Sequence, residues 1–350
     1  MELEFRHAGG AYPKAHIQCS DHAAWLPSPH DLHVGTLVAL DFGLLALGVL
    51  ALYFGAEWLV RGAAGLARAF GVSPLVVGLT IVSYGTSAPE LAVSVVAAQG
   101  GKPDIALGNV VGSNIANIAL ILGITALIAP PQVEGRLIRR ELPILMLSAL
   151  ALPVTLLSGS IERYEGILLT FAAVAFTLLT FRWARVAAVG PAQSSRDDVP
   201  WSRRGGLLLL SILGLAVLLI GGNVFVKGAV GLATAFGMSE KTVGLTVVAV
   251  GTSLPELAAS LVAALRGHSE LAVGNVVGSN IFNVLLILGV TSTISPIPGS
   301  LAAGRFDLSV MIGLTAVSVF VMRRQRVITR WEGAVLTGIY VTFLAVLALN

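Results

Sequence analysis

Charged residues and cysteines are scarce in this sequence of 350 residues. Asp, Glu, Lys and Arg make up only 12% of it, whereas 55% is hydrophobic and the mean hydropathy is +0.86. The single cysteine, Cys19, excludes a disulfide bond within the chain. So little charge in so much apolar sequence excludes an ordinary soluble protein and indicates a chain that crosses a membrane several times.

Histidine is nearly absent beyond the first 35 residues, which hold His7, His16, His22, His30 and His33. The sixth histidine, His268, falls in a loop between two apolar runs. Intramembrane metalloenzymes need His-rich motifs such as HExxH, and neither such a motif nor a pair of membrane aspartates is present. We therefore expect no enzyme and no cofactor, and we expect neither a nucleic-acid partner nor an obligate protein partner.

About ten apolar runs of roughly 20 residues follow one another, each long enough to cross a hydrocarbon core of about 30 Å. They lie near 36–60, 72–99, 104–129, 137–158, 160–181, 207–234, 239–265, 270–294, 306–323 and 331–349. The sequence therefore predicts an all-α polytopic membrane protein of about ten transmembrane helices, with the lipid bilayer as its surroundings.

The basic residues fall unevenly on the two faces that ten crossings create. Fifteen of the 22, all of them Arg, share one face, which we call the basic face. The other face carries Arg6, Lys14, Lys102, Arg163, Lys227, Lys241 and Arg305. Because cytoplasmic loops carry the excess of Lys and Arg, we expect the basic face in the cytoplasm and both termini outside.

The chain is predicted to have four parts. They are a polar N-terminal extension (1–35), five helices (36–182), a connector (183–206) and five more helices (207–350). The extension lacks the basic-then-apolar order of a signal peptide, so we expect the first span to be retained. Its histidines show no spacing of a defined metal site, which favours a loosely ordered extension over a metal-capturing tail. The connector is polar, lies on the basic face and is interpreted as the hinge between halves.

One unit is written twice in the chain. GTSAPE at 85–90 returns as GTSLPE at 251–256, and residues 78–128 match residues 244–294 without a gap at about 32 of 51 positions. An internal duplication is the only economical explanation. Since each half has five spans, an odd number, the second half must enter the membrane from the opposite side. A 5+5 inverted repeat is the architecture of secondary transporters.

Each copy places a glutamate within an apolar segment, beside hydroxyl groups and a proline. On a helix Glu90 has Thr86 and Ser87 on its own face, with Ser83 one turn further back. The same places around Glu256 hold Thr252, Ser253 and Ala249. Pro89 and Pro255 have no N–H for the carbonyls of the preceding turn, so backbone oxygens are released as well. An ionised carboxylate costs several kcal/mol at the bilayer centre, which makes both acids candidates for function.

The next helix of each copy adds amides and hydroxyls. GNVVGSNIAN at 108–117 and GNVVGSNIFN at 274–283 place four side chains at equivalent positions: Ser113, Asn117, Ser279 and Asn283. Asn109 and Asn275 lie on the same face, and the glycines four residues apart allow close helix packing. Carboxylate, hydroxyl and amide oxygens without paired Cys or His form a ligand set for a hard cation such as Ca²⁺ or Na⁺.

Glu57 differs from the other two acids, because Asn223 stands at the matching position of the second copy. An interfacial acid facing Arg61 one helical turn away is favoured over a residue of the ion pathway.

These doubled motifs resemble the two alpha repeats of the cation/Ca²⁺ exchanger superfamily, in its sodium/calcium exchanger branch of prokaryotic type. The resemblance covers about residues 36–349 and implies a ten-helix antiporter in a prokaryotic plasma (inner) membrane, with cation sites between helices 2, 3, 7 and 8. It assigns the site to Thr86, Ser87, Glu90, Ser113, Asn117, Thr252, Ser253, Glu256, Ser279 and Asn283, with backbone carbonyls near Ser83 and Ala249.

The resemblance favours exchange of Na⁺ for Ca²⁺ by alternating access. Some members of the superfamily, among them the potassium-dependent exchangers, carry Asp where this chain has Asn283, so K⁺ co-transport is the less favoured alternative. A proton-coupled Ca²⁺ antiporter is the other, since a buried Glu can also carry a proton. A passive channel is a further alternative that the inverted repeat disfavours.

Overall fold

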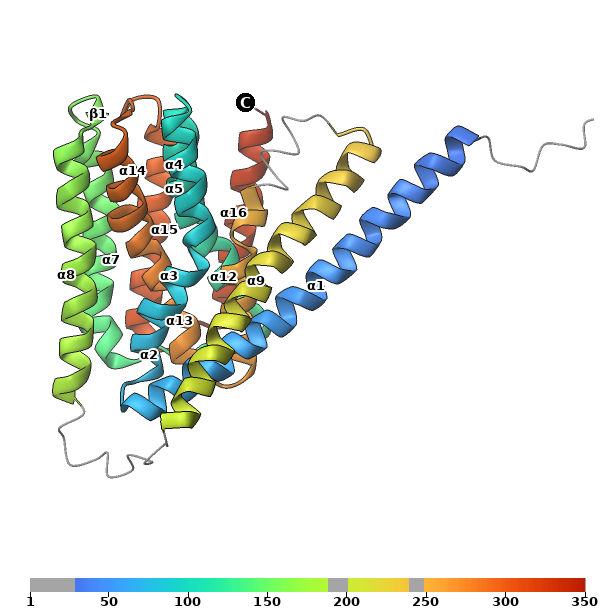
Figure 1. The fold of residues 1–350 in the computed structure, drawn as a ribbon. Coiled ribbons are helices and arrows are strands. Elements are labelled where there is room, and N and C mark those ends of the chain that lie inside the picture. Colours follow the sequence, from blue (N-terminus) through green and yellow to red (C-terminus); the bar gives the residue numbers. More distant parts are fainter. Residues whose placement is uncertain (1–28, 188–200, 239–248, 350) are drawn as a thin grey trace, which may run out of the picture.

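The computed structural model describes residues 29–187, 201–238 and 249–349, which form helices joined by short loops (Figure 1). Among these residues, seven helices are long and apolar enough to cross a membrane, and one bent pair of helices adds an eighth span. The chain is thus an all-α polytopic membrane protein whose two halves form a 5+5 inverted repeat, as predicted. Part of the predicted span at 239–265 lies outside the described residues.

The first half runs through ten helices and one strand. They are α1 (Pro29–Phe70), α2 (Pro74–Val77), the π-helix η1 (Gly78–Val82), α3 (Ser83–Thr86), α4 (Ala88–Gln99), α5 (Pro103–Ile115), the π-helix η2 (Ala116–Leu122), α6 (Gly123–Ile128), α7 (Gly135–Thr155) and, after strand β1 (Ser160–Ile161), α8 (Arg163–Ala187). Helix α1 therefore begins before residue 36, earlier than the sequence predicts, and at 42 residues it is longer than a membrane crossing requires.

The described helices of the second half follow the same order, but its strand comes one connection earlier. This half contains α9 (Trp201–Ala235), α11 (Ala249–Thr252), α12 (Leu254–Leu265), α13 (Ser269–Phe282), the π-helix η4 (Asn283–Leu288), α14 (Gly289–Ile294), strand β2 (Ile297–Pro298), α15 (Arg305–Gln325) and α16 (Arg330–Leu349). The two short strands pair antiparallel, with Ser160 opposite Pro298 and Ile161 opposite Ile297. This pairing ties the loop between α7 and α8 of the first half to the loop between α14 and α15 of the second.

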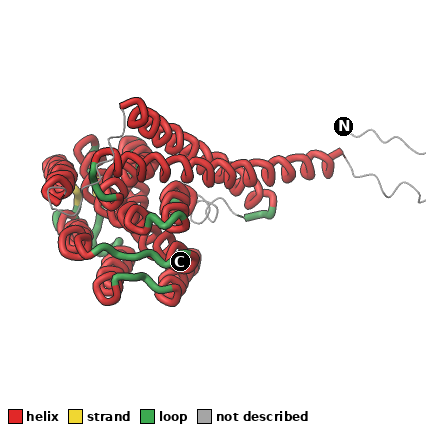
Figure 2. Tube along the Cα trace, turned by 90° about the horizontal axis from the view of Figure 1, so that it is seen from below, coloured by secondary structure: helices red, strands yellow, loops and turns green. Residues whose placement is uncertain are grey.

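Helices α1 and α9 lie side by side and lean away from the remaining bundle (Figures 1 and 2). Glycines every seven residues let their backbones approach. They are Gly48, Gly55 and Gly62 on α1 and Gly214, Gly221 and Gly228 on α9. A methyl group on Gly55 would lie 2.5 Å from the backbone nitrogen of Leu218, and one on Gly221 would lie 2.8 Å from that of Leu52. We call this contact the glycine seam.

The centre of the bundle is formed by the continuous helices of the two repeats. In the most apolar stretch of 18 residues between Ser269 and Ile294, 94% of the residues are buried, against 17% in that of α1. Phe282 in α13 is fully buried and packs on Tyr84, with ring centroids 4.0 Å apart. Gly274 and Gly278 of α13 approach the backbone of α2 and η1, at Leu75 and Leu79, which confirms the close packing predicted for them. A methyl group on their counterparts in α5, Gly108 and Gly112, would have no described atom of another element within 4 Å.

Candidate cation-binding site

Both GTS-P-E motifs interrupt a helix at the same serine. Ser87 lies between α3 and α4 with backbone angles of −83° and 6°, and Ser253 lies between α11 and α12 with −91° and 5°. Pro89 and Pro255 stand in the first turn of the helices that follow. There a missing N–H does no harm to the new helix. In the first copy the break bends the chain by 44°. The proline thus ends one helix and starts another, and it does so within the bundle.

The two acids of the motifs are buried. Glu90 and Glu256 each expose only 1% of their surface, although they belong to different halves of the chain. The Ser87 hydroxyl of the first copy donates a hydrogen bond to Glu256 Oε1 of the second at 3.0 Å. Glu90 follows Ser87 by three residues, so the two side chains lie on one side of the first copy's half-helix. The duplication therefore brings both predicted acids and a predicted hydroxyl into one place.

Several buried oxygens of the predicted site residues have no hydrogen-bond partner among the described residues. They are Glu90 Oε2, Glu256 Oε2, Asn117 Oδ1, Asn283 Oδ1, Ser253 Oγ and Ser279 Oγ. A buried polar atom without a partner costs about 1–3 kcal/mol, and more when it is charged. Six such oxygens, all from predicted site residues, fit a cation that takes oxygen ligands. In the described part of the chain, no three His, Cys, Asp or Glu side chains group as a transition-metal site would require.

The remaining predicted residues occupy different surroundings. Thr86 is buried and donates to Asn275 Oδ1 at 3.4 Å, whereas Ser83 donates to the carbonyl of Thr80 at 3.2 Å. Ser113 is buried and Thr252 is half-buried. Ala249 begins α11, but its side chain lies outside the described residues.

Asn117 and Asn283 stand at the start of matching π-helices, η2 and η4. A π-helix inserts an extra residue into the α-helical ladder and often occurs at functional sites. It changes which side chains share a face, so the simple four-residue spacing from Ser113 to Asn117 does not by itself describe their directions. Helical periodicity in the sequence could not reveal this.

Asn109 and Asn275 have a role that the sequence did not assign. The Asn109 amide donates to the carbonyl of Glu90 at 3.0 Å and to the Ser94 hydroxyl at 2.9 Å. The Asn275 amide makes the same two contacts in the second copy, with the carbonyl of Glu256 at 3.4 Å and with Ser260 at 2.9 Å. These asparagines thus fasten each half-helix that carries an acid to the helix beside it. The signal in the sequence that could have indicated this role was the presence of an asparagine at the same position of an apolar helix in both copies.

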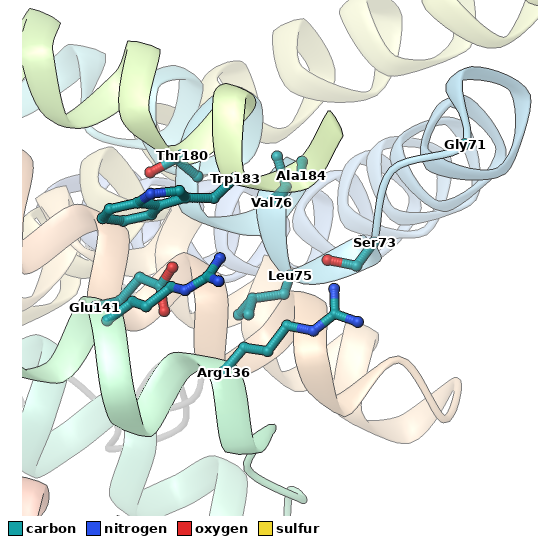
Figure 3. A pocket seen from close by; sticks show the side chains of 10 residues that line it. Gly71, Ser73, Leu75, Val76, Arg136, Glu141, Thr180, Trp183 and Ala184 are labelled. Carbon is teal, nitrogen blue, oxygen red and sulfur yellow. The ribbon is translucent and has the colours of Figure 1, made fainter. Parts of the chain in front are cut away.

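A small polar cavity, of about 30 Å³, is lined by none of the predicted site residues (Figure 3). Glu141 and Arg136 of α7 line one side of it, and Thr180 and Trp183 of α8 line the other. The guanidinium of Arg140 lies 5.2 Å from the centre of the Trp183 ring. This volume accommodates about one water molecule, and the two guanidinium groups repel cations. The cavity is therefore not a cation site.

An inverted repeat whose broken helices bring two buried acids together is the architecture of a secondary transporter of cations. Comparison with known proteins agrees. The family model described as "Sodium/calcium exchanger protein" matches residues 40–182 and 206–349. The chain belongs to the sodium/calcium exchanger family, which confirms the resemblance seen in the sequence.

Individual relatives match over most of their length. The chain is 41% identical to the "Putative antiporter CaxA" of Alkalimonas amylolytica, covering 88% of this chain and 98% of that protein. It is 33% identical to the "Sodium/calcium exchanger MaX1" of Methanosarcina acetivorans, covering 89% and 99%. A solved structure of the sodium-calcium exchanger NCX_Mj is similar with a TM-score of 0.78 at 32% identity, covering 89% of this chain and 99% of that one. The protein is thus an integral membrane exchanger of cations, and its relatives are transporters.

Proposed function

We propose that the protein exchanges Na⁺ for Ca²⁺ by alternating access, and that both ions bind at Glu90 and Glu256. The observation that carries the proposal is the hydrogen bond from Ser87 of one repeat to Glu256 of the other, between side chains that are almost fully buried. This contact between the repeats supports a site at their interface, where inverted-repeat transporters bind their substrates. The name of the relative MaX1 supports sodium and calcium as the ions.

The charge of the site suits this exchange. Glu90 and Glu256 together supply two negative charges, which balance one Ca²⁺. Hydroxyl and amide oxygens complete a shell of the kind that Ca²⁺ takes, with six to eight oxygen ligands at about 2.3–2.6 Å. We assign these ligands to Thr86, Ser87, Ser113, Asn117, Thr252, Ser253, Ser279 and Asn283, with backbone carbonyls near Ser83 and Ala249. Sodium ions compete for the same oxygens, and this competition couples the two fluxes.

Protons are the second candidate for the coupling ion. A proton on Glu90 or Glu256 would neutralise a carboxylate that is buried with one oxygen unpartnered. Desolvation favours the neutral form of a carboxyl group. Potassium is less favoured, because Asn283 adds no third acid to the described site.

We further propose that the basic face is cytoplasmic and that both termini are outside. The division into an extension (1–35), two repeats (36–182 and 207–350) and a connector (183–206) belongs to the same proposal. A new cysteine in the connector should then be protected from an impermeant maleimide in intact cells, whereas Cys19 should react. The reverse labelling pattern would overturn this orientation.

The coupling ion is tested with purified protein in liposomes. Uptake of ⁴⁵Ca²⁺ is measured after loading the vesicles with NaCl, with KCl or with an acidic buffer, each at otherwise equal composition. We expect uptake from sodium-loaded vesicles alone, and none after Glu90→Gln. Glu332→Gln is the matched control, since Glu332 lies at the start of α16 and binds Thr329 instead. Uptake driven only by the pH step would replace sodium by protons in the proposal.

A further inference from the structure

The glycine seam between α1 and α9 is symmetric, but the packing of this pair on the rest of the bundle is not. α1 packs along α12, whereas its repeat counterpart α9 does not pack along α4. As a result, Ala259 and Val262 of α12 are buried, at 0% and 6% exposure. Their counterparts Val93 and Val96 of α4 are 38% and 68% exposed and line an open groove of about 560 Å³.

This asymmetry identifies one of two related states. In an inverted-repeat transporter, each repeat adopts in turn the conformation that the other has now, as one unit rocks against the other. In the state in which the two repeats have swapped conformations, which we call the exchanged state, α9 covers α4 and α12 is uncovered. The structure is therefore the state that is closed beside α12, toward the basic face, and open beside α4.

An ion-pair cluster spans the closed contact. Glu57 of α1 is 5% exposed, and its Oε2 accepts a hydrogen bond from Arg266 Nε at 2.8 Å, just after the end of α12. Arg61, one turn along α1, lies with Nε 2.6 Å from Glu57 Oε1, which confirms that predicted pair. A second donor nitrogen of Arg266 lies 3.5 Å from the Tyr53 hydroxyl. The contact to Arg266 joins two elements, whereas the contact to Arg61 stays within one helix.

The second copy cannot form this cluster. Asn223 stands at the position of Glu57, Gly100 at that of Arg266 and Leu219 at that of Tyr53. The Asn223 amide donates to the carbonyl of Leu219 in its own helix instead. The glycine seam, which is the same in both copies, cannot favour either state. An ion pair present in one copy only can.

We propose that Glu57 and Arg266 form a one-sided latch that stabilises the state closed toward the basic face. The inference rests on the proposed alternating access but not on the identity of the ions. When α1 leaves α12, the buried Glu57 loses its partner across the contact, and nothing replaces that interaction in the exchanged state. The latch therefore sets the resting ratio of the two states and makes the two faces of the transporter unequal.

Two reciprocal cysteine probes test the latch in detergent, without any ion gradient. The labelling rate of Val93→Cys shows whether α9 covers α4, and that of Ala259→Cys shows whether α1 covers α12. Each probe is placed in a Cys19→Ser background. With Arg266→Gln, we expect maleimide labelling to become slower at Val93→Cys and faster at Ala259→Cys. The ratio should shift roughly threefold or more, on the scale of an ion pair buried on one side only. Glu57→Gln should act in the same direction.

The controls separate a latch from general loosening. Arg61→Gln breaks only the pair within α1 and should leave both labelling rates near those of the parent, as should Arg266→Lys, which keeps the charge. Faster labelling at Ala259→Cys with no change at Val93→Cys would mean local opening and would overturn the proposal, as would no change at either probe. Since neither probe needs transport, failure of Na⁺/Ca²⁺ coupling would be recognised separately in the liposome assay.

Discussion

The hydroxyl of Ser87 offers the sharpest test of the ion site. It donates to Glu256 Oε1 at 3.0 Å, and the exposed fractions are 4% for Ser87 and 1% for Glu256. A hydroxyl can give its proton to a carboxylate while its lone pairs bind a cation. Ser87→Ala therefore removes both an ion ligand and a hydrogen bond to the acid.

The expected size follows from that hydrogen bond. A hydrogen bond to a charged group contributes about 1.5–3 kcal/mol, and each 1.4 kcal/mol is about tenfold in binding. We expect the apparent KM for Ca²⁺ to rise roughly 10- to 150-fold in Ser87→Ala, with a smaller change in the maximal rate. Ser253 is the matched control from the second repeat, because its hydroxyl has no hydrogen-bond partner among the described residues. Ser253→Ala loses a ligand only, so its KM should rise less.

The assay is the initial rate of ⁴⁵Ca²⁺ uptake into sodium-loaded liposomes over a range of external Ca²⁺, at equal amounts of folded protein. An unchanged KM in Ser87→Ala would refute the reasoning. So would a larger effect in Ser253→Ala than in Ser87→Ala, because the two repeats would then differ in the opposite sense.

Three further changes probe other parts of the molecule. Glu90→Gln and Glu256→Gln should each abolish exchange while the protein still inserts and elutes as a single species, and wild-type uptake by either would remove that acid from the site. Asn283→Asp adds a third acid beside two buried ones, so exchange should become sensitive to pH or to K⁺ in the same liposomes; identical pH and K⁺ profiles in the variant and the parent would contradict this. Gly55→Val should lower the free energy of unfolding in detergent by about 1–3 kcal/mol, and with it the melting temperature, since the valine side chain would overlap the backbone of Leu218. Gly338→Val is the control, because no described atom outside its own helix lies within 4 Å of a methyl group there, and equal melting of both variants would argue against the glycine seam.

Much of the architecture could be predicted because its causes are local or repeated. Apolar runs of sufficient length must become helices in a membrane, since no other open structure satisfies the backbone there. The duplication with an odd number of spans required inversion, and Pro89 and Pro255 had to interrupt their helices. The acids Glu90 and Glu256 were recognisable because a buried carboxylate is too costly to be incidental.

Other features depend on which segments meet, and this is decided by the tertiary structure. The spacing of Ser87 and Glu256 in the sequence gives no sign that they bond to each other across the repeats. The glycines of α1 and α9 recur every seven residues, yet only the antiparallel packing of those helices shows what they serve. Arg266 could not be assigned to Glu57 from the sequence, because the two residues are 209 positions apart and meet only through the packing of α1 on α12. An inverted repeat encodes two such states with one sequence, and the packing of the folded chain selects between them.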